Sequence, residues 1–161
     1  RRQRQMCIRD RILNYFGNEI AYVDTTSVLS LYKQQKIVID HKDFCCLYQL
    51  IMYRKILRYN HKQAERFYQL GYEDSIMYAE SIKDFSYSDW RNIRSDLVLK
   101  AITDTAKVNK AYRNALNSVK NYASLGIDKE LDCSYKPSTA LNWCGDNLYG
   151  FALRRWCNVN I

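Results

Sequence analysis

The sequence predicts a single α+β domain that is dominated by helices and has a few short strands. The chain has 161 residues, which is enough to bury one hydrophobic core. It contains one proline and five glycines, so few residues interrupt long regular elements. Its hydrophobic fraction of 47% is typical of a globular protein. We expect this domain to cover residues 12–161.

The first elements are expected to be strands. Residues Ile12 to Phe16 favour β-structure and are followed by Gly17-Asn18, a turn signal. Ile37 to Ile39 predicts a second short strand. The dipeptide Asp40-His41 directly after it is suited to begin a tight turn.

A central buried helix is predicted from Phe44 to Leu57. This segment is almost wholly apolar and is longer than an ordinary strand. Apolar residues fall on nearly every face of it, as in a helix that is enclosed by the core. We expect its most buried residues to be Leu47, Leu50, Ile51 and Ile56.

Four more helices are predicted from apolar residues at helical spacing. The first covers Lys62 to Leu70 and stops at Gly71, and the second begins at Ser88 as its N-cap. The third runs from Val108 to Tyr122, and the last is capped by Asp146 or Asn147. The apolar stripe of the first helix is Ala64, Phe67 and Tyr68, and that of the second is Trp90, Ile93, Leu97 and Ala101, with Arg91, Arg94 and Lys100 on its outer face. The stripe of the third helix is Ala111, Tyr112, Ala115, Leu116 and Val119. The stripe of the last helix is Leu148, Phe151 and Ala152, followed by Arg155.

The net charge of +8 is concentrated at the start of the chain. Residues 1–11 hold five arginines and one aspartate, and they carry little apolar area. We interpret them as a poorly packed, non-native tail that resembles translated sequencing-adapter sequence. The alternative is a basic arm that binds a phosphate backbone. On the first interpretation, deletion of residues 1–11 leaves the thermal stability nearly unchanged.

The pattern of cysteines and histidines predicts no metal site. No pair has the C-x-x-C spacing, and the two histidines, His41 and His61, lie in no ligand motif. We also expect no other cofactor, and reduced thiols in a cytoplasmic protein. No signal peptide or membrane-spanning run is visible, so no membrane partner is expected. The cysteines are Cys7, Cys45, Cys46, Cys133, Cys144 and Cys157.

Five short motifs follow one another in a characteristic order. They are Asp40-His-Lys-Asp-Phe44 after a short strand, Tyr48 and Lys55 on the central helix, Trp90 leading a later helix, and Trp143-Cys-Gly-Asp-Asn147-Leu-Tyr-Gly150-Phe-Ala-Leu153 near the end. This order and spacing resemble the NADAR (YbiA-like) family of N-glycosidases, which act on ribosylated nucleotide-type substrates. The resemblance covers nearly the whole chain from Ile12. It implies a NADAR-like fold with a pocket for an ADP-ribose-like ligand, lined by Tyr48, Lys55, Trp90, Trp143 and Asn147.

The chain departs from the family pattern where catalysis is expected. Tyr48 and Gln49 occupy the positions of the family's glutamate and histidine. Cleavage of a glycosidic bond is well served by a carboxylate, and tyrosine is a poor base at neutral pH. Asp146 is the candidate replacement carboxylate. We therefore expect catalysis to be weakened or lost, and whether the protein is an enzyme stays open.

Each candidate residue also has a purely structural interpretation. Tyr48 and Trp90 are suited to core packing, and Asn147 to capping a helix. Lys55 is either a phosphate-binding cation or a lysine at a helix end whose stem covers apolar surface. Trp143 beside Gly145 is the better candidate for a pocket.

The strongest nucleic-acid signal is the segment from Tyr53 to Lys62, in which arginine and lysine alternate with tyrosine. Bases could stack on the tyrosines while the cations neutralise phosphates. Three hypotheses result: a ligand-binding NADAR-like protein with little or no hydrolysis, an active N-glycosidase or ADP-ribosyl hydrolase with rearranged catalytic residues, and a structural or nucleic-acid-associated protein of viral or phage origin that keeps only the fold.

Overall fold

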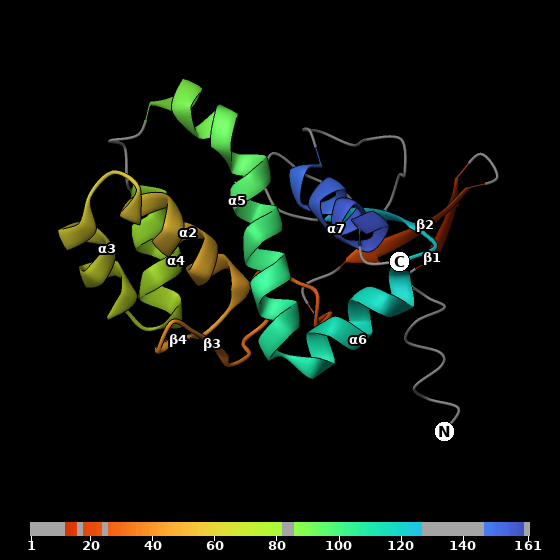
Figure 1. Cartoon of the computed structure of the whole chain (residues 1–161), viewed down its shortest axis with the longest axis horizontal. Coiled ribbons are helices and arrows are strands. Elements are labelled where there is room, and N and C mark those ends of the chain that lie inside the picture. The colour runs from red at the N-terminus through yellow and green to blue at the C-terminus, as the bar shows by residue number, and fades with distance from the viewer. Residues whose placement is uncertain (1–11, 16–17, 24–25, 82–85, 127–146, 160–161) are drawn as a thin grey trace. The chain divides into compact units, whose positions relative to one another are not determined.

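The computed structural model describes residues 12–15, 18–23, 26–81, 86–126 and 147–159. These residues form six helices and five strands, so the chain is a helix-dominated α+β protein as the sequence predicts (Figure 1). The basic tail of residues 1–11, Trp143 and Asp146 lie outside the described residues.

The chain divides into two compact units. One is continuous, from Leu31 to Lys110, and we call it the inner unit because the other unit flanks it in the sequence. The other, the outer unit, combines the residues up to Ser30 with those from Ala111 onward.

The inner unit is built around one helix. Helix α2 packs against three other helices and against a strand of a two-stranded hairpin. Figure 1 shows these helices around α2. The elements are β3 (Ile37–Ile39), β4 (Lys42–Phe44), α2 (Leu47–Leu57), α3 (His61–Tyr68), α4 (Tyr72–Ser81) and α5 (Tyr87–Val108).

The strands β3 and β4 form an antiparallel hairpin with a two-residue loop. Ile39 pairs with Lys42, which leaves Asp40 and His41 as the loop. Both loop residues have positive φ angles, 52° and 62°, as a type I′ turn requires. The tight turn at Asp40-His41 is therefore confirmed.

Helix α2 is the central buried helix that the sequence predicts. Leu47, Leu50, Ile51 and Ile56 are each at most 1% exposed. The helix begins three residues later than expected, because Phe44 belongs to β4 and Cys46 is the N-cap. The Cys46 sulfur accepts the backbone N–H of Gln49, as the side chain of an N-cap residue commonly does.

Helices α3 and α4 flank α2. Helix α3 is confirmed, with Ala64 and Phe67 fully buried, whereas Tyr68 is only half-buried. Helix α4 is not among the predicted elements. Its buried residues with described side chains are Ser75 and Ala79, which are too small to mark an apolar stripe.

Helix α5 differs from its prediction in its start and in its buried face. Its N-cap is Ser86, whose hydroxyl accepts the Asp89 N–H, and not Ser88. Arg94, expected outside, is only 7% exposed, so that expectation is wrong. Ile93 and Leu97 are half-buried, whereas Trp90 and Ala101 are buried as predicted. The buried face also includes Val98, Ile102, Thr105 and Ala106.

The outer unit contains a three-stranded sheet in the order β1-β2-β5. The first two strands are antiparallel, and β5 runs parallel to β2. Helix α7 packs against β5. The elements are β1 (Ile12–Tyr15), β2 (Asn18–Val23), α6 (Lys110–Val119), β5 (Ala123–Gly126) and α7 (Leu148–Val159).

Two buried tyrosines connect three segments of the outer unit. The hydroxyl of Tyr149 donates to the carbonyl oxygen of Leu29. The hydroxyl of Tyr112 lies 2.9 Å from the Tyr149 hydroxyl and must be the donor there, since the Tyr149 proton is already used. Burial raises the pKa of Tyr112, so this phenol remains a neutral donor.

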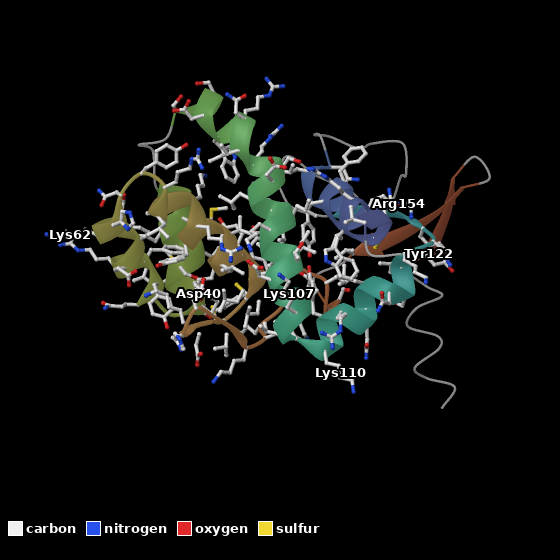
Figure 2. The ribbon with its side chains drawn as sticks, viewed as in Figure 1. Asp40, Lys62, Lys107, Lys110, Tyr122 and Arg154 are labelled. Carbon is white, nitrogen blue, oxygen red and sulfur yellow. The ribbon has the colours of Figure 1, made fainter. Side chains whose placement is uncertain are left out.

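The helices of the outer unit match the predictions only in part. In α6, Tyr112 and Leu116 are buried but Ala111 is exposed. In α7, Leu148 and Ala152 are buried, whereas Phe151 is 67% exposed. Arg154 of α7 donates to the carbonyl oxygens of Lys120 and Tyr122, just before β5; Figure 2 labels Arg154 and Tyr122.

Candidate ligand-binding site

Tyr48, where the resemblance places a catalytic glutamate, lies in the core of the inner unit. Its side chain is 1% exposed, and its ring centre is 4.8 Å from that of Tyr32. Its backbone N–H donates to the carbonyl oxygen of Leu31 at 2.9 Å. These contacts account for Tyr48 as a packing residue.

Gln49, at the family's histidine position, joins two segments of the backbone. Its side-chain oxygen accepts the Cys45 N–H at 2.9 Å, and its side-chain nitrogen donates to the Leu70 carbonyl at 3.2 Å. The residue is 2% exposed. A neutral amide satisfied at both ends holds the start of α2 against the chain that follows α3.

Lys55 and Trp90 are brought together. The Lys55 ammonium lies 4.5 Å from the centre of the Trp90 ring, within the range of a cation–π interaction. Trp90 is 6% exposed and Lys55 is half-buried. This contact fixes the end of α2 against the first turn of α5.

The structure does not show the remaining predicted site residues next to Lys55 and Trp90. Trp143 and the candidate carboxylate Asp146 lie outside the described residues. Asn147 belongs to the outer unit and directly precedes α7. Its carbonyl accepts the Phe151 N–H at 2.9 Å, and its φ angle is 50°. It therefore stands at the cap position that its structural interpretation predicts.

A surface groove, here called the α2–α5 groove, follows the end of α2 and the first half of α5. It consists of two adjoining cavities of about 350 and 420 Å³ that share Arg58, Asn92 and Ile93. Cavities of this size can hold a small organic ligand. The other lining residues are Arg54, Tyr59, Asp89, Asp96 and Leu97.

The groove combines cations, carboxylates, an aromatic ring and apolar side chains. Arg58 is exposed, and Tyr59 is 39% exposed. Guanidinium groups bind phosphate in a planar, two-point geometry, and an exposed aromatic ring can stack on a base. Asp89 and Asp96 can accept hydrogen bonds from hydroxyl or amino groups.

Arg54 is held in place by an ion pair. One of its terminal nitrogens lies 2.6 Å from Asp104, which also receives Lys100 at 3.0 Å. Burial opposes ionisation of Asp104, but the hydrogen bonds from Lys100 and Arg54 outweigh it and lower the pKa of this carboxyl group. The other terminal nitrogen of Arg54 is buried without a hydrogen-bond partner among the described residues.

The sequence signals part of this groove. Arg54, Arg58 and Tyr59 belong to the basic and aromatic segment between Tyr53 and Lys62. Asn92 and Asp96 carry no such signal, because polar residues on the outer face of a helix are ordinarily solvated. The exposed Lys62 does not line either cavity.

No group of three or more His, Cys, Asp or Glu side chains that could hold a metal ion occurs among the described residues. No described helix combines the length and the apolar character needed to cross a bilayer. Comparison with protein-family models and with curated proteins finds no match to this chain.

Proposed function

We propose that this chain is a NADAR-like protein that binds a ribosylated, ADP-ribose-like nucleotide in the α2–α5 groove, with hydrolysis weakened or lost. The observation that carries the proposal is the composition of the groove, in which Arg54, Arg58, Tyr59 and Asn92 line adjoining cavities. The motif resemblance supports the class of ligand.

The acidic residues of the groove favour a small nucleotide over a nucleic acid. Asp89 and Asp96 would repel a continuous phosphate backbone. A ribosylated nucleotide has few phosphates and many hydroxyl and amino donors, which these carboxylates can accept. Arg58 then binds the phosphate, Tyr59 stacks on the base, and Asn92 contacts the ribose.

The positions of Tyr48 and Gln49 support the loss of hydrolysis. Both are nearly inaccessible and are used in packing or backbone hydrogen bonds. Neither can activate a water molecule from such a position. The alternative function is an active N-glycosidase with rearranged catalytic residues. Asp146 is its candidate carboxylate from the sequence, and Asp89 and Asp96 are the described carboxylates that line the groove. The described cysteines are unbridged, and we propose the cytoplasm as the compartment that keeps them so.

The test is calorimetric titration of the full chain with ADP-ribose. Arg58→Ala is expected to weaken binding by about 10-fold or more, since a charge-assisted hydrogen bond contributes roughly 1.5–3 kcal/mol. Arg66→Ala is the matched control, because Arg66 is an exposed arginine of α3 that lines neither cavity. Equal affinity of the Arg58 variant and the unmodified chain would contradict the proposal.

Two further measurements separate the alternatives. A base-release assay with ADP-ribose should show no turnover; turnover that Asp96→Asn abolishes would establish the active enzyme instead. Titration with a single-stranded oligonucleotide should give weaker binding than ADP-ribose. Tighter binding of the oligonucleotide, falling steeply with salt, would favour the nucleic-acid-associated protein.

A further inference from the structure

The two adjacent thiols at the junction of β4 and α2 form a pair with unequal surroundings. The sulfur atoms of Cys45 and Cys46 are 4.0 Å apart, within hydrogen-bond distance for sulfur. Cys46 is fully buried, whereas Cys45 is partly exposed. An oxidant in solution can therefore approach Cys45 but not its neighbour.

The backbone holds this pair rigidly. The Cys45 N–H donates to Gln49 and its carbonyl accepts the Gln35 N–H at 2.8 Å. The Cys46 sulfur is occupied as the N-cap of α2. In the neutral pair the Cys45 S–H donates to the Cys46 sulfur. Once Cys45 has lost its proton, only the Cys46 S–H can donate across this contact, so Cys46 then stabilises the Cys45 thiolate.

We propose that Cys45 is a peroxide-sensitive thiol, oxidised to a sulfenic acid by hydrogen peroxide or an organic hydroperoxide, and that Cys46 is the positioning residue that stabilises its thiolate. This inference is independent of the ligand in the α2–α5 groove. It rests on the paired sulfurs, on their contrasting exposure and on the start of an 11-residue helix beside them.

The reaction is a two-electron transfer to the peroxide. The Cys45 thiolate attacks the terminal peroxide oxygen, an S–O bond forms and the O–O bond breaks. The leaving hydroxide or alkoxide takes a proton, so the products are the Cys45 sulfenic acid and water or an alcohol. Cys46 remains a thiol, because a disulfide would require its sulfur to leave the helix cap and close to about 2.05 Å.

The electrostatics favour this reaction near neutral pH. The hydrogen bond from Cys46, with smaller contributions from backbone and Ser75 hydrogen bonds, lowers the pKa of the Cys45 thiol to about 7 against the opposing effect of burial. Tyr72 of α4 also lies near enough to be influenced by both thiols. This lowering raises the share of Cys45 that is thiolate at neutral pH. After allowance for the lower nucleophilicity of a less basic thiolate, we expect roughly fivefold faster oxidation than for an ordinary thiol.

The experiment treats the full chain with hydrogen peroxide in the presence of dimedone, which traps sulfenic acids. Trypsin then releases residues 43–54, which contain Cys45 and Cys46 and no other cysteine. Fragmentation of this peptide in a mass spectrometer assigns the dimedone adduct to one of the two cysteine sulfurs. It also distinguishes the adduct from oxidation of Met52, which lies in the same peptide. Cys157 serves as the internal control, since burial raises the pKa of its thiol.

The expected result is a Cys45 adduct that forms at least roughly five times faster at pH 7 than any adduct of Cys157. Cys46→Ala should slow it and move its pH profile upward, whereas Cys46→Ser restores both the donor and the helix cap and should keep the profile near the original. An upward shift that Cys46→Ser does not reverse would overturn the positioning role. Equal labelling of Cys45 and Cys157, or a Cys45–Cys46 disulfide as the product, would overturn the inference.

Discussion

Lys55 and Trp90 contact each other through a cation–π interaction, with the ammonium 4.5 Å from the ring centre. The neighbouring residue of α2, Arg54, reaches instead to Asp104, more than three turns farther along α5. Two consecutive basic residues of α2 therefore hold well-separated points of the same helix. This arrangement fixes the wall of the α2–α5 groove.

The Lys55–Trp90 contact should appear as an energetic coupling. Lys55→Met keeps the apolar stem and removes the charge, while Trp90→Leu removes the ring. In a double-mutant cycle measured by urea denaturation, we expect a coupling of about 0.5–2 kcal/mol. Lys62→Met, at an exposed position of α3, should change stability by less than about 0.5 kcal/mol. Strictly additive effects would show that the contact contributes nothing.

The core of the inner unit should be sensitive to truncation. Leu50→Ala or Ile51→Ala removes buried methyl groups and leaves a cavity, so each should lower the free energy of unfolding by about 2–5 kcal/mol. Met77→Ala is the control, because Met77 is 71% exposed on α4. Urea denaturation measures both changes, and equal small losses would place α2 outside the core.

Restoring the family's glutamate should not restore an enzyme. Tyr48→Glu would place a carboxylate where the present side chain is 1% exposed against Tyr32, so we expect a loss of at least about 3 kcal/mol in stability. Tyr48→Phe should cost only about 0.5–1.5 kcal/mol. Thermal unfolding and the base-release assay would check both; a stable, active Tyr48→Glu variant would refute the assignment of Tyr48 to packing.

The Arg54–Asp104 ion pair should make the free energy of unfolding fall as the pH is lowered. The pKa of Asp104 is lowered on folding, so its ionised form stabilises the fold above the unfolded value near 4, and this contribution disappears as the pH falls through the folded pKa. Asp104→Asn should cost about 3–5 kcal/mol at pH 7 and lack this acid dependence. Asp74→Asn, on exposed α4 surface, should cost less than about 1 kcal/mol. Urea denaturation at pH 7, 5 and 3 would contradict the prediction if both variants behaved alike.

The sequence predicts the inner unit well where local signals agree. The apolar segment that includes Leu50 identifies the central helix, and Asp40-His41 marks the hairpin turn. The buried face of helix α5 is predicted wrongly at Arg94, because residue type alone does not distinguish a buried arginine from a solvent-exposed one. Helix α4 is missed, since Ser75 and Ala79 bury too little apolar area to reveal a stripe.

Long-range relationships account for most of what the sequence does not predict. Strands β2 and β5 pair in parallel, but each is short, and the sequence of neither strand indicates which strand it pairs with. Asn92 and Asp96 line the groove because α5 packs against α2, and this contact cannot be inferred from the sequence around either residue. By contrast, the contact between Lys55 and Trp90 unites two residues that the motifs select independently.

The division of the chain into a continuous and a discontinuous unit has a consequence for its synthesis. The segment from Leu31 to Lys110 is a compact unit of continuous sequence, so it can begin to pack as soon as it has left the ribosome. Strand β2 must wait for β5, and the Leu29 carbonyl must wait for Tyr149, 120 positions later. During that interval the unpaired edge of β2 is open to other chains. The rate at which the ribosome delivers the residues from Ala111 to Tyr149 therefore sets how long this edge is exposed to aggregation.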